Sequence, residues 1–414
     1  MKIPLAIIGN GAAAAETIIA LRSCGYTDAI DLFADNDHAP YNPMLGPYLV
    51  KRKISEQKAF PFGGHDFYEK YTVTAHLGPA VKTLDPRERA FATADGQEHS
   101  YGRCLVATGA RPSLPPIRGL REAVESSTAP VYTIQTFADG VKLREGAEKV
   151  LADVAEPHAA VVGASFAGVK VADVLHGLGF RVTVVERETS ILPLSAHPWC
   201  ARLLETHLSS DGYDLRLGAA LAGVDIVEGR VRLDFGALPG VTDPGGAEGT
   251  ACEESSTHQD VHLAVICTGS RPAIGFIAPG AVDTGVGILV DEHMRSSIPT
   301  LYAAGDVARG KSLLSGRHEI IGLWASARYQ GRAAGHGLAG APSGYSGSVP
   351  HNITHVGQRL FASVGCVREY DNITTCSEGG TYQLRAWQNG RLVGINTMMA
   401  GPDLGLAVPV HEVK

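Results

Sequence analysis

The sequence lacks the features that mark several classes of protein. No apolar run approaches the ~20 residues that a membrane-spanning helix needs, and no CxxC pair occurs among the seven cysteines. Asp and Glu (43) outnumber Lys and Arg (36), so the net charge of -7 offers no footprint for a nucleic-acid polyanion. These absences exclude a transmembrane protein and a disulfide scaffold, and they argue against nucleic acid as a partner.

The cysteine count and the first residues predict a cytoplasmic protein. An odd number of widely spaced cysteines is typical of a reducing compartment. Met1 is followed at once by an apolar stretch and a glycine turn, which leaves no room for the three regions of an export signal. His318-Glu319 does not begin an HExxH motif, so no metal site is expected.

The first informative pattern is a strand, a glycine turn, a helix and a second strand. An apolar strand, Ile3 to Ile8, leads into Gly9-x-Gly11-x-x-Ala14 and a helix of small residues. That helix ends near Cys24-Gly25, and the next strand, Ile30 to Phe33, is followed by Asp35. This order predicts one βαβ unit that binds a dinucleotide.

The same pattern begins again at His158. A strand from Ala159 to Val162 leads into Gly163-x-Ser165-x-x-Gly168, a helix as far as Leu178-Gly179, and a strand from Val182 to Val185 followed by Glu186. In both copies the acid lies near the ~20-residue offset of the dinucleotide fingerprint.

The repetition extends to the strand that leaves each unit. Val106-Ala-Thr108-Gly109-Ala-Arg111-Pro112 and Ile266-Cys-Thr268-Gly269-Ser-Arg271-Pro272 are the same element, 160 residues apart. A lone glycine fingerprint is weak evidence, but two fingerprints with matching exits predict a duplicated nucleotide-binding unit.

Each fingerprint has a chemical interpretation. A glycine turn lets the backbone approach a pyrophosphate, and the helix N-terminus offers free N–H groups, so two units predict two dinucleotides. Glu186 would repel a 2′-phosphate and favours NADH over NADPH, although Arg187 beside it weakens that preference. In the first unit the ribose-binding acid is either Asp35 or Asp37.

A third motif carries a resemblance to a known family. The segment from Leu301 to Ala308 contains Gly305-Asp306 and precedes a helix from about Leu323 to Leu338. With the two fingerprints before it, the chain resembles the two-dinucleotide flavoprotein reductases of the pyridine-nucleotide-disulfide oxidoreductase superfamily. The resemblance spans Ile3 to about Thr397. It implies that Asp306 binds the ribityl chain of FAD, and that the helix beginning near Leu323 faces the flavin, with Trp324 beside the ring.

A missing thiol narrows the class. Disulfide reductases of the superfamily carry a CxxxxC pair on the helix of the first unit, and peroxide- or oxygen-reducing relatives keep one cysteine. Here the matching stretch, Ala39 to Tyr48, has no sulfur except that of Met44. It is similar to the PYdRPpLSK segment of ferredoxin and rubredoxin reductases that serve oxygenases.

The chain also departs from that segment. The positions of its Arg, Ser and Lys hold Pro43, Gly46 and Pro47, and the glutamate that partners the family lysine is replaced by Lys170. We hypothesise that Lys170 supplies the positive charge that stabilises the reduced flavin; a solvated or structural Lys170 is the alternative.

The fold class expected is α/β, with two Rossmann-like, glutathione-reductase-like domains and a small α+β interface domain. The FAD-binding domain is expected at 1–115 and 265–342, the NAD-binding domain at 116–264, and the interface domain at 343–414. Short strands are predicted at Leu360–Val364, Tyr382–Trp387 and Leu392–Thr397, with a hairpin turn at Asn389-Gly390. Residues 236–260, rich in Gly, Pro, Ser and Thr, are interpreted as a flexible insertion between two strands, with a docking role as the alternative.

The motifs and the resemblance together give a list of candidate site residues. For FAD these are Gly9, Gly11, Ala14, Ala15, Asp35, Asp37, Tyr41, Asn42, Thr108, Gly109, Arg111, Gly305, Asp306, Leu323 and Trp324. For NADH they are Gly163, Ser165, Phe166, Gly168, Glu186, Arg187, Thr268 and Gly269. Lys170 is the one catalytic candidate.

We expect an NADH-dependent FAD reductase that passes electrons singly to a ferredoxin-like iron-sulfur protein. No side chain needs to act as an acid or a base in the hydride step. A flavin oxidase, an NADH:quinone reductase, a non-catalytic redox sensor and a subunit of a larger dehydrogenase remain open. The sequence does not specify the electron acceptor, the terminal oxygenase, or whether the chain is a monomer, a homodimer or part of a complex.

Overall fold

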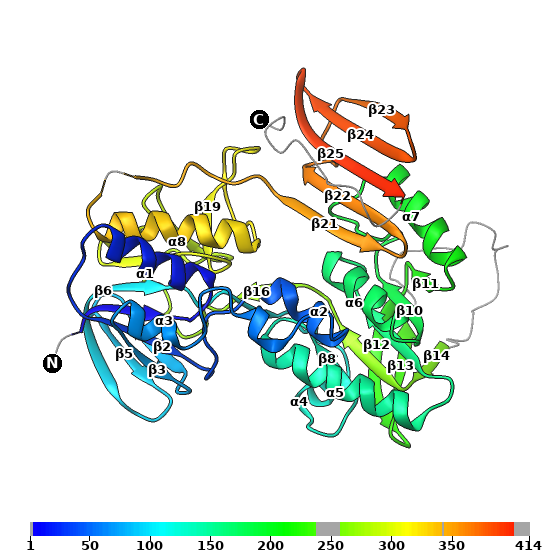
Figure 1. The fold of residues 1–414 in the computed structure, drawn as a ribbon, viewed down its shortest axis with the longest axis horizontal. Helices are drawn as coiled ribbons and strands as arrows, with labels where there is room; N and C mark the ends of the chain where they lie inside the picture. The colour runs from blue at the N-terminus through cyan, green and yellow to red at the C-terminus, as the bar shows by residue number, and fades with distance from the viewer. Residues whose placement is uncertain (1–2, 237–256, 342, 401–414) are drawn as a thin grey trace, which may run out of the picture. The chain divides into compact units, whose positions relative to one another are not determined.

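The computed structural model describes residues 3–236, 257–341 and 343–400. Its contacts divide the chain into two units (Figure 1). Unit 1 consists of Met1–Leu45, Ile54–Arg111 and Ser270–Pro350, and unit 2 of Gly46–Lys53, Pro112–Gly269 and His351–Lys414. The division into FAD-binding, NAD-binding and interface domains stays a prediction.

The main sheet of unit 1 combines a parallel and an antiparallel part. The parallel strands, in order of pairing, are β3 (Val73–Leu77), β2 (Ile30–Ala34), β1 (Ile3–Ile8), β6 (Glu98–Val106) and β18 (Leu301–Ala303). The first half of β6 pairs antiparallel with β5 (Ala90–Thr93), which pairs with β4 (Val81–Asp85). Residues Leu5 to Ile8 of β1 are all buried, which explains the continuous apolar run.

Two helices of unit 1, α1 (Ala12–Ser23) and α8 (Trp324–Leu338), lie side by side (Figure 1). Small residues permit this approach, because a Cβ atom added to Gly331 would lie 2.3 Å from the carbonyl oxygen of Ala13. The hydroxyl of Thr17 donates to the carbonyl of Gly331 at 2.8 Å, and the buried Glu16 pairs with Arg328 at 2.5 Å. The run of alanines in α1 is therefore a packing surface.

The other elements of unit 1 are short. They are η1 (Pro43–Leu45), η2 (Glu56–Ala59), α3 (Asp66–Lys70), β17 (Ile288–Leu289), β19 (Ala308–Lys311) and β20 (His318–Glu319). The strands β7 (Ala110–Pro112) and β16 (Ser270–Pro272) lie where the chain leaves and re-enters this unit.

Unit 2 is built on a five-stranded parallel sheet. Its strands, in order of pairing, are β11 (Asp214–Leu217), β10 (Arg181–Glu186), β9 (His158–Val162), β15 (Leu263–Ile266) and β8 (Val131–Thr133). Its helices are α2 (Gly46–Val50), α4 (Leu120–Glu125), α5 (Phe137–Asp153), α6 (Phe166–His176) and α7 (Pro198–Ser210). A separate antiparallel sheet contains β12 (Ala220–Val227), β13 (Arg230–Gly236) and β14 (Thr257–Val261).

The predicted duplication is confirmed in the hydrogen bonds of the two sheets. The N–H of Gly9 donates to the carbonyl of Phe33 at 2.8 Å, and the N–H of Gly163 donates to that of Val185 at 2.7 Å. The two glycine turns are therefore held in the same register relative to the following strand, and the predicted α/β fold class is confirmed.

The C-terminal strands form an antiparallel sheet in unit 2. Its order is β21 (His351–Val356), β22 (Arg359–Gly365), β25 (Arg391–Ala400), β24 (Thr381–Gln388) and β23 (Asn372–Glu378). The hairpin predicted at Asn389-Gly390 is confirmed, with φ angles of 51° and 71° that suit a type I′ turn. Strands β21 and β23 were not predicted from the sequence.

Most of the predicted insertion at 236–260 lies outside the described residues. Its edges do not: Gly236 ends β13, and Thr257 begins β14, which pairs antiparallel with β13. The expectation of strands on both sides is confirmed, and residues 257–260 are strand.

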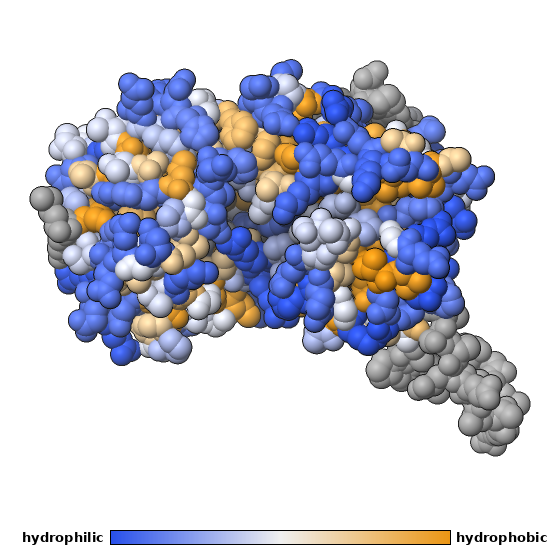
Figure 2. Space-filling model, turned by 90° about the horizontal axis from the view of Figure 1, so that it is seen from below, coloured by the Kyte–Doolittle hydropathy of each residue, from blue (hydrophilic) through white to orange (hydrophobic). Residues whose placement is uncertain are grey.

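Hydrophilic and apolar side chains are both present on the surface. On the face seen in Figure 2, most of the surface is hydrophilic and the apolar side chains form separate patches. None of the described helices is long and apolar enough to span a membrane.

Two of the buried cysteines, Cys200 and Cys267, are unreactive. Burial raises the pKa of their thiols to about 12, so neither forms a thiolate readily.

Candidate functional site

The glycine turn of unit 1 leaves room for a ligand at only one of its two glycines. Gly9 has a φ of 111°, and a Cβ atom there would lie 2.2 Å from the carbonyl oxygen of Ala107. Gly11, by contrast, has a φ of -92° and no atom within 4 Å of an added Cβ. Gly9 is thus required by the fold, whereas the open space at Gly11 fits the close approach of a pyrophosphate.

The two acids that follow β2 differ in their surroundings. Asp35 forms an ion pair with Arg111. Burial alone would raise the pKa of Asp35, but the hydrogen bond and charge of Arg111 outweigh it and hold that pKa below its usual range. Asp37 is 87% exposed and lies 3.4 Å from His38. The two units can be aligned by the hydrogen bond that the first glycine of each turn donates, from Gly9 to Phe33 and from Gly163 to Val185. In this alignment Ala34, the residue after Phe33, occupies the position of Glu186.

Asn10, between the two glycines, is a buried polar residue that the sequence analysis missed. Its side-chain amide donates to the carbonyl of His38 at 2.6 Å and to the hydroxyl of Tyr68 at 2.7 Å. Its Oδ1 atom is buried and accepts no hydrogen bond from the described residues. Asn10 therefore fixes the segment after β2 beside the glycine turn. Its position between the two glycines of the fingerprint is the sequence feature that could have identified it as a site residue.

Polar atoms without partners gather where α8 begins. Asp306 lies beside Gly322, and no described residue donates a hydrogen bond to its carboxylate. Burial raises the pKa of Asp306. The indole Nε1 of Trp324 and the hydroxyl of Ser326 are also buried without a partner among the described residues. Three orphaned polar groups at one helix start fit a polar ligand that supplies hydroxyls and acceptors.

Other candidates of unit 1 hold the backbone of this region. The N–H of Gly305 donates to the Oε1 atom of Gln330 at 2.8 Å, and the hydroxyl of Thr108 donates to the carbonyl of Ala273 at 2.8 Å. The side chain of Asn42 accepts from the N–H of Met44 at 3.0 Å, which places it at the start of η1. Gly109 has a φ of 63°, and Tyr41 is partly buried.

The glycine turn of unit 2 repeats the geometry of unit 1. Gly163 has a φ of 104°, and a Cβ atom there would lie 2.4 Å from the carbonyl oxygen of Cys267. A Cβ atom at Gly168 would lie 1.8 Å from the carbonyl oxygen of Gly163. Gly168 therefore permits the close contact between α6 and the turn, while Phe166 begins α6 and stacks on Phe361 with ring centroids 6.0 Å apart.

The acid that ends β10, Glu186, is fixed against the turn. The carboxylate of Glu186 accepts from the N–H of Ala164 at 2.7 Å and from the N–H of Glu188 at 2.9 Å. Arg187 is 74% exposed and pairs with Glu188 at 3.2 Å. The hydroxyl of Thr268 donates to the carbonyl of Ser113 at 2.7 Å, the counterpart of the bond made by Thr108, and Gly269 has a φ of 98°.

Helix capping separates the candidate binding helices from two other long helices. The helices α1, α6 and α8 have no side-chain hydrogen bond at their N-caps and no acid in the first turn. By contrast, α5 has a capping box made by Thr136 and Asp139, and the side chain of His197 caps α7. The three uncapped N-termini retain free N–H groups that can bind phosphate or a ring carbonyl.

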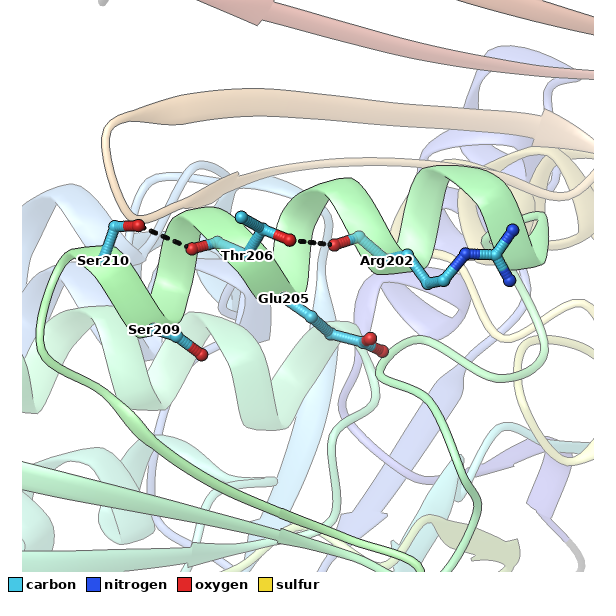
Figure 3. Close-up of a pocket in the computed structure, with 5 residues that line it drawn as sticks. All are labelled: Arg202, Glu205, Thr206, Ser209 and Ser210. Carbon is cyan, nitrogen blue, oxygen red and sulfur yellow. Dashed lines mark hydrogen bonds between the residues drawn. The ribbon is translucent and has the colours of Figure 1, made fainter.

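Two other features do not form a site. Figure 3 shows a shallow pocket along α7 in which Thr206 and Ser210 donate to carbonyls of their own helix at 2.9 Å. Glu205, which also lines this pocket, accepts from the N–H of Ile191 at 3.0 Å. Among the described residues, no group of three His, Cys, Asp or Glu side chains is placed to hold a metal ion.

A comparison with protein families decides the class. The model of the family described as pyridine nucleotide-disulphide oxidoreductase matches residues 3–331. The chain belongs to this family. It is therefore an oxidoreductase that uses FAD and NADH, and the uncapped helices, the open space at Gly11 and the orphaned polar groups at the start of α8 fit these two dinucleotides.

Several known proteins are similar to this chain over most of their length. The epsilon subunit of the NADH-dependent phenylglyoxylate dehydrogenase of Aromatoleum evansii is 29% identical over 377 residues, 90% of this chain and 80% of that protein. The rubredoxin-NAD(+) reductase of Pseudomonas putida is 23% identical over 397 residues, 95% of each chain. The solved ferredoxin reductase for the CYP199A2 system of Rhodopseudomonas palustris has a TM-score of 0.80 at 22% identity, covering 96% of this chain and 91% of that one, and so shares the fold.

The side chain of Lys170 lies against that of Tyr48. Its ammonium donates to the hydroxyl of Tyr48 at 3.1 Å and lies 4.5 Å from the centroid of the Tyr48 ring. Tyr48 belongs to the stretch that lacks cysteine. Lys170 is thus held by a hydrogen bond and a cation–π contact within unit 2, and its role toward the flavin stays a prediction.

Proposed function

We propose that the chain is an NADH-dependent reductase that delivers electrons one at a time to a ferredoxin-type iron-sulfur protein, which in turn serves an oxygenase. When bound, FAD supplies the chemistry that accepts a hydride at N5 and releases single electrons. The observation that carries the proposal is the absence of cysteine from Ala39 to Tyr48. Relatives named as rubredoxin and ferredoxin reductases support it.

In this proposal the residues of unit 1 bind the pyrophosphate and the adenosine ribose of FAD. The backbone at Gly9, Gly11, Ala14 and Ala15 lies at the uncapped start of α1 and would bind the pyrophosphate. Asp35, already oriented by Arg111, would accept hydrogen bonds from the adenosine ribose. This assignment favours Asp35 over Asp37, because the side chain of Asp37 is 87% exposed.

The start of α8 would hold the other end of the same cofactor. The unpartnered carboxylate of Asp306 would accept hydrogen bonds from ribityl hydroxyls. The free N–H groups after Leu323 would bind the pyrimidine carbonyl, with Trp324 beside the ring. These contacts would satisfy polar groups that have no partner among the described residues.

The residues of unit 2 would hold NADH. The uncapped start of α6, with Ser165 and Phe166, would bind the pyrophosphate beside Gly163 and Gly168. Glu186 would accept hydrogen bonds from both ribose hydroxyls, because two backbone bonds fix its carboxylate and leave lone pairs free. Arg187 pairs with Glu188 and is therefore not available to bind a 2′-phosphate, which is consistent with a preference for NADH over NADPH.

One experiment separates the proposed function from its rivals. The purified, FAD-loaded protein is mixed with NADH in a stopped-flow instrument, and turnover is then followed with cytochrome c, with and without an added ferredoxin. Fast flavin reduction and ferredoxin-dependent turnover support the proposal. Ferredoxin-independent turnover that produces peroxide at the full rate would instead establish an oxidase.

A second function has its own support, because the relative that is 29% identical is a subunit of a larger dehydrogenase. In that case the flavoprotein would pass its electrons to, or take them from, a partner subunit. Native mass determination of the protein purified from its own host distinguishes the two: a stable hetero-complex that contains iron-sulfur subunits supports the subunit, and a free flavoprotein supports the reductase.

A further inference from the structure

Unit 2 contains a cavity of about 480 Å³ that lies apart from the nucleotide fingerprints. Three elements form its walls: α2 with the residues that follow it, the middle of α6, and the turn between β21 and β22 (Figure 1). None of the fingerprint residues from Gly163 to Gly168, nor Glu186, lines it. Its volume lies in the range of small-molecule sites.

The charge of the cavity wall is unbalanced. Four cationic side chains line it, namely Lys51, Lys53, Lys170 and Arg359, against the single carboxylate of Asp173. That carboxylate is already used, because Lys51 lies 3.0 Å from it and both side chains are at least 80% buried. The cavity therefore retains three positive charges.

Those three charges have no carboxylate partner in the described part of the chain. Lys170 is bound to the hydroxyl and ring of Tyr48, and no ion pair joins Lys53 or Arg359 to any described acid. Asp211, which lies beside Gly357, does not line the cavity. Lys53 is exposed, and Lys170 and Arg359 are half-buried, so the cavity is partly open to solvent. Since like charges repel at short range, three of them around one cavity favour an anion there.

A histidine in the wall reports the same positive potential. His355, on β21, lines the cavity. Burial lowers its pKa, and Lys170 lowers it further; Asp173 opposes this, while Lys53 and Lys51 add to it. The imidazole is thus neutral near pH 7 and can still donate a hydrogen bond to a bound anion.

We infer that this cavity binds a small anion of the phosphate class. Arg359 offers a planar fork of donors suited to two phosphate oxygens, and Lys53 and Lys170 offer ammonium groups from the other two walls. The volume exceeds that of a single phosphate ion, which favours a phosphorylated organic molecule over free phosphate. This site goes beyond the proposed electron transfer and does not depend on it.

Calorimetric titration of the FAD-loaded full chain tests the inference. The probes are inorganic phosphate, pyrophosphate, glycerol 3-phosphate and fructose 1,6-bisphosphate, with citrate as a carboxylate control, all at one ionic strength set with NaCl. Saturable binding of an organic phosphate identifies an organic ligand, and preferential binding of inorganic phosphate identifies the free ion. Tighter binding of citrate, or no saturable binding of any phosphate, would overturn the inference.

Two variants assign the binding to this cavity. Arg359→Gln and Lys53→Gln should each weaken phosphate binding roughly tenfold or more, since each removes a charge-assisted hydrogen bond. Arg391→Gln and Lys149→Gln remove the same charges from exposed positions of unit 2 outside the cavity and should leave binding unchanged. Equal losses in all four variants, or none in the first two, would place the anion elsewhere. Phosphate bound at the fingerprints would not respond to these substitutions, and Lys53→Gln keeps the test valid if Arg359→Gln does not fold.

Discussion

The carboxylate of Glu186 accepts a hydrogen bond at 2.7 Å from the main-chain N–H of Ala164, which lies within the glycine turn of unit 2. This bond links the end of β10 to the loop where a pyrophosphate would bind. The acid is therefore oriented before any nucleotide arrives, which lowers the entropic cost of binding a ribose.

Replacing Glu186 should change the choice between nicotinamide cofactors. In Glu186→Ala, KM for NADH should rise roughly tenfold or more, because charge-assisted hydrogen bonds to the ribose are lost, and KM for NADPH should change less. The measurement is the ratio of kcat/KM for the two cofactors, which a purely structural defect would not alter. Glu145→Ala, which removes an exposed carboxylate of α5 elsewhere in unit 2, is the control, and an unchanged ratio in Glu186→Ala would remove Glu186 from the site.

The two glycines of the first fingerprint should respond differently to alanine. Gly9→Ala should destabilise the protein by about 2 kcal/mol or more, since it combines a positive φ with a clash against Ala107. Gly11→Ala should leave the unfolding transition of the apoprotein nearly unchanged, yet weaken FAD binding. Chemical denaturation and FAD titration of both variants check this. Full FAD affinity in Gly11→Ala would show that no pyrophosphate approaches that turn.

Asp306 should carry a cost to stability that the cofactor relieves. Burial raises its pKa, so the ionised carboxylate is disfavoured in the folded apoprotein. Below the ordinary pKa of about 4 both states are protonated and the cost is absent. As the pH rises from there through the raised pKa, the folded state loses stability, and the loss persists at neutral pH.

The substitution Asp306→Asn should therefore stabilise the apoprotein at pH 7 but not near pH 4, and should weaken FAD binding roughly 10- to 100-fold. Denaturation of both apoproteins across this pH range measures the first effect, and equilibrium dialysis measures the second. A stability difference that is constant with pH would contradict the account of this carboxyl.

Lys170→Met tests the hypothesis of charge tuning. If the ammonium stabilises the anionic reduced flavin, its loss should make the midpoint potential more negative and slow hydride transfer roughly tenfold or more. Lys149→Met, an exposed lysine on α5, is the control. Unchanged potential and rate in Lys170→Met would leave this lysine with its bond to Tyr48 and its place in the cationic cavity.

Features encoded by neighbouring residues could be predicted from the sequence. The strand Ile3–Ile8, the start of α8 after Leu323, and the Asn389-Gly390 hairpin each follow from local periodicity or turn chemistry. The duplication was also visible, because both copies preserve the residues that set the glycine turn.

Features that join distant residues could not be predicted. Asn10 meets Tyr68 across 58 positions, and Arg328 meets Glu16 across 312. The cationic cavity combines residues near 50, 170 and 357, each of which is unremarkable in its own segment. The acid after β2 illustrates the same limit, since the hydrogen-bond register that puts Ala34 in the place of Glu186 exists only in the folded sheet.

Anaerobic reduction of the purified flavoprotein by NADH, after alkylation of its accessible thiols, shows whether electrons reach the flavin without a thiol. We expect a yellow protein whose visible flavin band is bleached by NADH at the same rate with and without alkylation. A colourless protein that takes up no FAD, or reduction that is lost when thiols are blocked, would contradict this expectation.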